Sequence, residues 1–142
     1  MKIYLMALSF LFASPLLFAQ DLNNHRWDDR VILIFGDNPS QAAVQTQVKK
    51  LNAKPAELAD RNLVLYQIYQ QEGQTPTGQN LSTKELKAFR KKFNIEAGSF
   101  ALLLIGKDGG VKMKKTSVVD PRSIFDLIDS MPMRQAEMRR KG

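Results

Sequence analysis

The sequence predicts an α/β protein with a mixed four-stranded sheet and helices on both faces of that sheet. Two apolar runs without alternation, residues 31–35 (VILIF) and 100–105 (FALLLI), are typical of strands buried on both faces. Asp108-Gly109 directly after the second run favours a tight type I′ hairpin turn, because both residues tolerate left-handed backbone conformations. A strand–helix–strand start needs a right-handed crossover with parallel pairing, whereas a hairpin adds an antiparallel strand.

Residues 1–19 have the pattern of a secretory signal peptide. Lys2 supplies a short positive region, residues 3–12 are apolar, Pro15 interrupts the apolar stretch, and Ala19 offers a small residue for cleavage. The alternative is an uncleaved membrane anchor, for which the apolar part is short. We therefore expect an exported protein, periplasmic or secreted, with no transmembrane segment after cleavage.

The composition excludes one class of chemistry and narrows the partners. The chain has 142 residues and no cysteine, so thiol oxidoreductase and thiol peroxidase activities lack their nucleophile. The length suits one domain with a substantial core. With 21 basic and 14 acidic residues, the net charge is +7. An exported cationic protein is attracted to acidic proteins and to anionic envelope lipids or polymers, and no nucleic acid partner is expected.

A polar lead-in, residues 20–30, is predicted to precede the domain at residues 31–131. His25 is the only histidine, and without cysteines or clustered carboxylates it forms no recognisable zinc set, so neither a metal nor another cofactor is expected. We expect a solvated His25 side chain in a mobile segment. Trp27 is expected to pack this segment onto the domain rather than to serve as a platform for a ligand.

The turn after the first strand begins a helix that is predicted to end near Asn52. Asn38 is a suitable N-cap, and Pro39 suits the first helical position. Free backbone N–H groups at such a helix start attract anions or polar ligands, unless capping side chains satisfy them internally. Both interpretations stay open, and the candidate contact residues here are Asp37, Asn38 and Ser40.

A third strand is predicted over residues 62–69, followed by a polar loop over residues 70–81. Ser82 then opens a second helix, and Glu85 completes its capping box. The lysines on the polar face of this helix, and those on the strand after the hairpin, are expected to be solvated. A continuous basic patch is the alternative interpretation.

The last quarter of the chain holds the hairpin and one more helix. Lys107 and Asp108 are predicted to form the hairpin tip, and a functional loop is the alternative. Asp120-Pro121 is typical of a capped helix start, and Pro132 is expected to kink or interrupt that helix. Residues 132–142 form a basic tail, which we expect either to be frayed and solvated or to dock onto an acidic partner or anionic lipid.

Five segments carry a resemblance to a known family: Trp27 to Arg30, residues 31–35, Ala59-Asp60-Arg61-Asn62-Leu63, residues 104–112 (LIGKDGGVK) and residues 128–134 (IDSMPMR). Through them the chain resembles a bacterial exported family of domains of unknown function with a peroxiredoxin- or thioredoxin-like fold. Relatives of that family, sometimes called P-DUDES domains, occur in animal sushi-repeat and matrix-associated proteins. The resemblance implies a thioredoxin-like fold, which the predicted element order also indicates, and a non-cytoplasmic setting. It implies no established activity.

True thioredoxins differ from this chain at their redox site. Their Cys-x-x-Cys motif opens the helix after the first core strand, and by that register its two positions fall near Ser40 and Ala43. Their cis-proline loop precedes the buried strand, where this chain has Ser99-Phe100. Both parts of the redox site are therefore missing.

The leading hypothesis is a thiol-free thioredoxin-like binding module that contacts a protein or an anionic envelope component. The alternative is a thiol-independent enzyme that uses the helix start near Ser40, although His25, the only candidate imidazole base, is remote in sequence. No catalytic residue is assigned. The candidate binding residues, chosen by position and charge, are Asp37, Asn38, Ser40, Lys107, Asp108, Arg134, Arg139 and Arg140.

Overall fold

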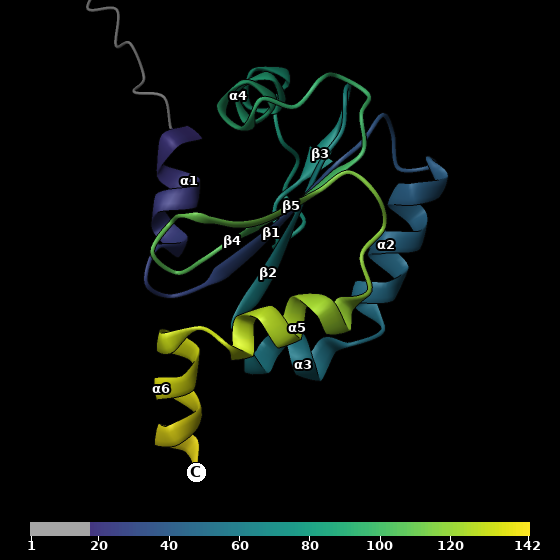
Figure 1. Ribbon diagram of the computed structural model, residues 1–142. Helices are drawn as coiled ribbons and strands as arrows, with labels where there is room; N and C mark the ends of the chain where they lie inside the picture. The colour runs from purple at the N-terminus through teal and green to yellow at the C-terminus, as the bar shows by residue number, and fades with distance from the viewer. Residues whose placement is uncertain (1–17) are drawn as a thin grey trace, which may run out of the picture.

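The computed structural model describes residues 18–142, which form one mixed sheet with helices on both of its faces (Figure 1). The strand order is β3-β2-β1-β4-β5, and β1 pairs in parallel with β2 and antiparallel with β4. This confirms the predicted mixed α/β sheet. The strands are β1 (Arg30–Phe35), β2 (Leu63–Ile68), β3 (Gly73–Gln74), β4 (Ala101–Ile105) and β5 (Val111–Lys115).

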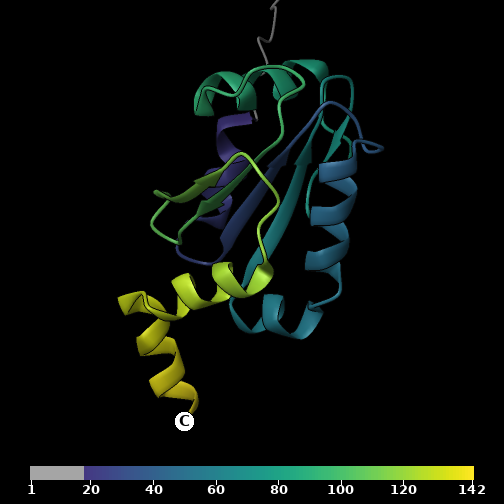
Figure 2. The same cartoon turned by 45° about the vertical axis from the view of Figure 1, so that its right-hand side comes forward.

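Residues 18–142 contain six helices, of which α6 projects beyond one end of the sheet, and the core lies in two layers on either side of the sheet (Figures 1 and 2). Alternate residues of β1 point to opposite faces: Ile32 packs with residues of α2 and α5, whereas Leu33 packs with residues of α4. The two apolar runs are thus buried on both faces, as predicted. The helices are α1 (Phe18–His25), α2 (Ala42–Asn52), α3 (Pro55–Asp60), α4 (Thr83–Phe93), α5 (Pro121–Asp129) and α6 (Pro132–Lys141).

The sheet has five strands rather than the predicted four, because β3 lies within the segment that was predicted to be a loop. Two residues are too few to show an alternating pattern in the sequence. Gly73 allows the close approach of β3 to β2, since a Cβ at this position would lie 2.5 Å from the carbonyl oxygen of Gln67 and 2.7 Å from Leu86 Cδ2.

The start of α2 differs from the prediction by three residues. Gln41, not Asn38, is the N-cap, and Pro39 lies outside the helix. The Asn38 side chain instead stabilises a local turn, in which its Oδ1 accepts a hydrogen bond from the Ser40 N–H at 2.8 Å. The two other predicted caps are confirmed: Ser82 and Glu85 form the capping box of α4, and Asp120 caps α5.

The hairpin between β4 and β5 spans residues 106–110 and is not the tight type I′ turn that we predicted. Within residues 106–110 only Gly109 has a positive φ, of 85°, whereas a type I′ turn requires two such residues. The Gly106 N–H donates to the Gly110 carbonyl at 2.9 Å, and Asp108 Oδ1 accepts from the Gly110 N–H at 2.9 Å. The Asp108 side chain therefore closes a longer loop.

The predicted signal peptide falls mainly on residues 1–17, which lie outside the described residues, so it stays a prediction. The lead-in after it, residues 20–30, contains the end of α1, a helix that we did not predict. Two further expectations are wrong. Trp27 was expected to pack the lead-in onto the domain, but it is 58% exposed. His25 was expected to be solvated, but it forms two hydrogen bonds within the domain. Within residues 18–142, no helix is long and apolar enough to cross a membrane.

Pro132 lies at a helix interruption, as predicted, because α5 stops at Asp129 and a separate helix, α6, starts at Pro132. The residues after Pro132 are helical, which was not expected of a frayed tail. Tertiary ion pairs hold this helix against the rest of the domain.

Candidate functional site

The buried arginines and most of the tertiary ion pairs of the described residues lie at one end of the sheet, which we call the hairpin end. It consists of the start of β1 at Arg30, the hairpin at residues 106–110, and the helix α6. Arg30 is 1% exposed, so its charge is stabilised only if partners within the protein satisfy it.

Glu137 of α6 is the partner of Arg30. The two guanidinium nitrogens Nη1 and Nη2 lie 3.2 Å from the two carboxylate oxygens, and Nη1 also donates to the Arg61 carbonyl at 2.9 Å. Lys107 Nζ approaches the same carboxylate at 2.6 Å. Burial alone would raise the pKa of Glu137, but the hydrogen bonds from Lys107 and Arg30 outweigh burial and hold that pKa below its usual value. The carboxylate is therefore ionised at neutral pH.

Arg134 forms the second half of this network. Its side chain is buried; Nε donates to Asp129 at 3.0 Å, and its two terminal nitrogens contact the side chain and the carbonyl of Asp60. Asp129 also receives a two-pronged contact from Arg61, and Asp60 receives Lys141 Nζ at 2.8 Å. Hydrogen bonds from Lys141 and Arg134 lower the pKa of Asp60 to about 2.

The network contains five cations and three carboxylates, which leaves two positive charges in excess. It connects α6 to α3, α5, β1 and the hairpin. Its members are Arg30, Arg61, Lys107, Arg134 and Lys141 with Asp60, Asp129 and Glu137.

A groove of about 270 Å³ separates the hairpin from the turn between α5 and α6. We call it the methionine groove. Its walls combine an apolar side from the α5–α6 turn with the stems of basic residues from the sheet. The lining residues are Arg30, Gly106, Lys107, Asp108, Lys112, Met131, Pro132 and Met133.

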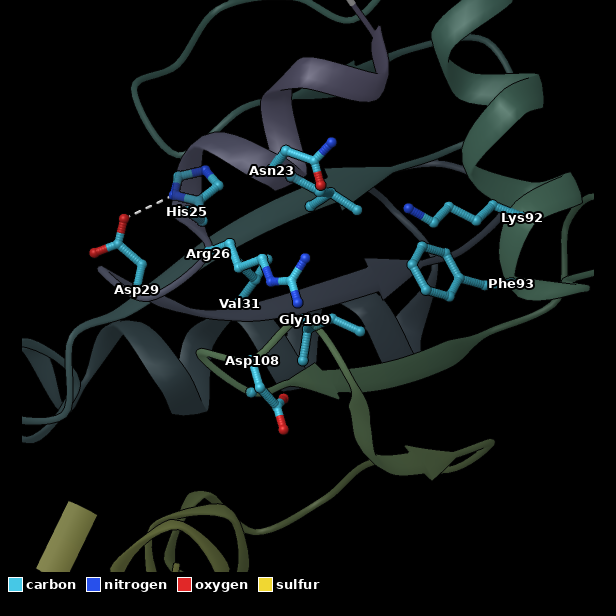
Figure 3. A pocket seen from close by; sticks show the side chains of 12 residues that line it. Asn23, His25, Arg26, Asp29, Val31, Lys92, Phe93, Asp108 and Gly109 are labelled. Carbon is cyan, nitrogen blue, oxygen red and sulfur yellow. Dashed lines mark hydrogen bonds and ion pairs between the residues drawn. The ribbon is translucent and has the colours of Figure 1, made fainter. Parts of the chain in front are cut away.

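A second cavity, of about 170 Å³, lies on the other side of the hairpin, between α1 and α4 (Figure 3). We call it the α1–α4 cavity. Leu22, Val31, Phe93 and Ile105 supply apolar surface. The polar lining residues, several of which Figure 3 labels, are Asn23, His25, Arg26, Asp29, Lys92 and Asp108.

His25 closes one side of this cavity and ties α1 to the sheet. Its Nδ1 lies 2.7 Å from Asp29 Oδ2, and its Nε2 lies 2.8 Å from the hydroxyl of the buried Tyr66 on β2. The two rings meet edge to face, with centroids 5.6 Å apart. Both ring nitrogens are engaged, so in this conformation neither one is available to take a proton from a ligand.

The sequence-predicted residues Asp37, Asn38 and Ser40 lie at the opposite end of β1. A six-residue strand separates the two ends by roughly 17 Å. Asp37 accepts hydrogen bonds from the Gln70 side chain and, at 3.0 Å, from Asn38 Nδ2. These groups satisfy one another, but they do not cap α2, because its N-cap is Gln41 and no described side chain accepts from the first N–H groups of the helix. The distance also separates Ser40 from His25, so no observation favours Ser40 as an enzymatic nucleophile.

The other predicted residues are brought together only in part. Lys107 and Arg134 meet at Glu137, at 2.6 and 3.7 Å, and Asp108 lines both cavities. Arg134, however, was predicted as a surface contact and is instead 2% exposed. Its guanidinium is fully used inside the domain. Arg139 and Arg140 are exposed on α6.

Sequence reasoning missed the key role of Glu137. The signal was visible: Glu137 is the single acidic residue among residues 132–142, three positions after Arg134 and four before Lys141. Arg26 and Lys92 were also missed, because no local pattern in the sequence shows that they line the same cavity. In residues 18–142 no cluster of three or more His, Cys, Asp or Glu side chains could hold a metal ion.

Comparisons with known proteins place the chain in a family without an assigned activity. The family described as "Domain of unknown function (DUF4174)" matches residues 21–137. A zebrafish (Danio rerio) protein, "Coiled-coil domain-containing protein 80", is 29% identical over 133 residues. That alignment covers 82% of this chain but only 15% of the zebrafish protein, so the chain corresponds to a small part of that relative.

Solved peroxiredoxin structures share the fold. A reduced 2-Cys peroxiredoxin from Plasmodium vivax superposes with a TM-score of 0.60 at 15% identity, over 81% of this chain and 84% of that one. Plasmodium yoelii Prx1a gives a TM-score of 0.61 at 15% identity, over 81% and 80% of the two chains. At this identity the likeness concerns the fold alone, and it confirms the predicted thioredoxin-like architecture.

Proposed function

The chain belongs to the DUF4174 family, and from that premise we propose that it is an exported, thiol-free thioredoxin-like binding module whose partner is an acidic protein. We assign the contact surface to the hairpin end, around the methionine groove. Lys107 and Asp108, chosen from the sequence, lie at the centre of this surface.

One observation carries this assignment: the three large hydrophobic side chains that are exposed in the described residues all surround the same hairpin. They are Trp27 at 58%, Val111 at 51% and Met133 at 41%. The Trp27 N–H donates to the Lys107 carbonyl at 2.6 Å, Val111 directly follows the hairpin, and Met133 lines the methionine groove. Exposed apolar side chains that gather in one place mark interaction sites more often than scattered ones do.

The backbone of Trp27 adds to this argument. Its φ is 74°, a left-handed conformation that is costly for a bulky residue. The hydrogen bond to Lys107 holds the chain in this conformation while the indole stays in solvent. Trp, Met and Arg are also the residue types that are enriched at protein interfaces.

The charge of the hairpin end selects an acidic partner. The ion-pair network carries two positive charges in excess, and Arg139 and Arg140 extend the cationic surface along α6. A partner with carboxylates around an apolar anchor complements both properties. We expect the anchor to enter the methionine groove.

The test is a capture experiment with tagged protein that begins after Ala19. Envelope extract from the source organism is applied at low and at moderate salt, and wild type is compared with Trp27→Ala and Met133→Asp. We expect one acidic protein to survive moderate salt, and each variant to retain at least roughly tenfold less of it, as for anchor residues of an interface. Asn38→Ala, at the opposite end of β1, is the matched control and should capture as wild type does.

Two results would contradict the proposed function. Equal capture by wild type and both hairpin-end variants would move the contact surface elsewhere. Retention of anionic lipid or polymer alone, lost as salt rises, would replace the acidic protein with an anionic surface as the partner. Export is tested separately, by cell fractionation and by determining the N-terminus of the mature protein.

A further inference from the structure

We propose that the α1–α4 cavity binds the carboxylate of a small organic acid between Arg26 and Lys92. This site lies on the other side of the hairpin from the methionine groove and does not require a protein partner. Figure 3 shows the two cationic side chains reaching into the cavity from opposite sides, Arg26 from the end of α1 and Lys92 from α4.

Within residues 22–142, whose side chains the structure describes, neither cation has an acidic partner. The Arg26 guanidinium carbon lies 5.2 Å from the ring centroid of its neighbour Trp27, and Lys92 Nζ lies 5.6 Å from the ring centroid of its neighbour Phe93. Two like charges that share a cavity repel each other. A bound anion would turn this repulsion into two attractive contacts.

The two carboxylates that line the cavity are already engaged. Asp29 pairs with His25 at 2.7 Å. Asp108 turns its carboxylate away from Arg26, toward Lys112 Nζ at 2.8 Å and the Gly110 N–H at 2.9 Å (Figure 3). The hydrogen bonds from Lys112 and Gly110 lower the pKa of Asp108, which keeps it ionised and bound to those partners. The positive charges of Arg26 and Lys92 are thus left for a ligand.

The shape of the cavity selects the class of anion. A guanidinium binds carboxylates through paired hydrogen bonds, and the Asn23 amide lines the same space. The apolar surface of Val31, Ile105 and Phe93 suits a short hydrocarbon stem. At about 170 Å³ the cavity is smaller than sites for drug-sized ligands, which span roughly 300–1,000 Å³. A carboxylate on a short apolar stem fits, whether it belongs to a free acid or to the end of a peptide.

The protein carries its own reporter for this site. Trp27 is the only tryptophan in the chain, and its ring contacts the Arg26 guanidinium. A carboxylate that binds Arg26 changes the environment of this ring. We therefore expect a saturable change of tryptophan fluorescence when the ligand binds, and calorimetry provides a readout that does not depend on Trp27.

The experiment titrates the protein at low salt with acetate, butyrate and hexanoate, and with butyramide as the uncharged control. We expect affinity to rise with stem length, butyramide not to bind, and Arg26→Gln and Lys92→Gln each to raise the Kd at least roughly tenfold. Lys91→Gln, a change to the adjacent exposed lysine of α4 that does not line the cavity, should bind as wild type does. Both cavity variants change exposed side chains, and circular dichroism checks that they fold.

A pair of short apolar peptides, one with a free C-terminal carboxylate and one amidated, separates the two sources of the ligand. Binding of the free peptide alone, without the small acids, assigns the site to a chain terminus. Absence of saturable binding by every carboxylate, or binding that neither variant weakens, overturns the proposal. Met133→Asp should leave this titration unchanged, because Met133 lines the methionine groove and not the α1–α4 cavity. A failure of the carboxylate site can therefore be distinguished from a failure of the proposed protein contact.

Discussion

Arg30 and Glu137 form a two-pronged ion pair across 107 positions of the chain, with both nitrogen–oxygen distances at 3.2 Å. Arg30 begins the central strand β1, and Glu137 lies on the last helix, α6. Their contact makes the C-terminal segment part of the folded domain. It also places α6 beside the hairpin, where its first turn forms one wall of the methionine groove.

Removing the carboxylate of Glu137 should destabilise the protein strongly. Glu137→Gln leaves the buried Arg30 without its counter-charge, and breaking a buried pair in this way costs about 3–5 kcal/mol. Urea unfolding of both proteins measures the difference. Glu96→Gln, a change to an exposed carboxylate, is the matched control. A loss of less than about 0.5 kcal/mol, the range of ordinary surface changes, would show that the pair does not hold α6.

The free energy of unfolding should fall at acidic pH. The pKa of Asp60 is lowered from 3.8 to about 2, and the pKa values of Asp129 and Glu137 are also lowered. A carboxylate with a depressed folded-state pKa stabilises the fold above its unfolded-state pKa, and this contribution is lost as pH falls through the folded-state value. For Asp60 the loss spans pH 3.8 to about 2.

Urea unfolding at a series of pH values checks this prediction. The contribution of Asp60 to the free energy of unfolding should be constant above its unfolded-state pKa and should decline below it. Asp60→Asn should be less stable than wild type at neutral pH and should show a shallower decline. If the free energies of unfolding of the variant and wild type decline in parallel as pH falls, the Asp60 contacts with Arg134 and Lys141 do not contribute to stability.

The hydrogen bond between His25 and Tyr66 should control the attachment of α1. Tyr66→Phe removes the hydroxyl that lies 2.8 Å from His25 Nε2, and an unmet buried hydrogen bond costs about 1–3 kcal/mol. We expect faster amide exchange in α1 than in wild type. Tyr69→Phe also removes a hydroxyl, one that donates to Gln67 at 2.6 Å, and should leave exchange in α1 unchanged. Equal amide exchange rates of α1 in wild type and Tyr66→Phe would show that this hydrogen bond does not hold α1 to the sheet.

Gly73 should be required for the fifth strand. In Gly73→Ala the new Cβ would meet the Gln67 carbonyl at 2.5 Å, so β3 must move away from β2. We expect a destabilisation of about 1–3 kcal/mol, as for other overpacked sites, measured by urea unfolding. Gly110→Ala is the milder control, because its nearest neighbour is a side-chain oxygen at 3.3 Å. Full stability of Gly73→Ala would mean that the short strand adapts without cost.

The predictable part of the fold has local physical causes. The central strands β1 and β4 were visible because continuous apolar runs indicate burial on both faces, and Ser82 with Glu85 marked a helix start because capping acts within four residues. The start of α2 was misplaced because Asn38 serves equally well in a local turn. Among the candidate site residues, Lys107 and Asp108 lie on the proposed surface, whereas Arg134 is buried.

By itself, the sequence determined the thioredoxin-like class of this protein, its central strands, its net positive charge and its lack of cysteine, since each follows from composition or from spacing along the chain. Only the tertiary structure decided which charges are exposed and which are buried. Arg134 and Arg139 are both arginines on one helix, yet one faces Asp60 and Asp129 while the other faces solvent. Whether a charge is paired depends on residues that are distant in sequence, and folding alone brings them within hydrogen-bond distance.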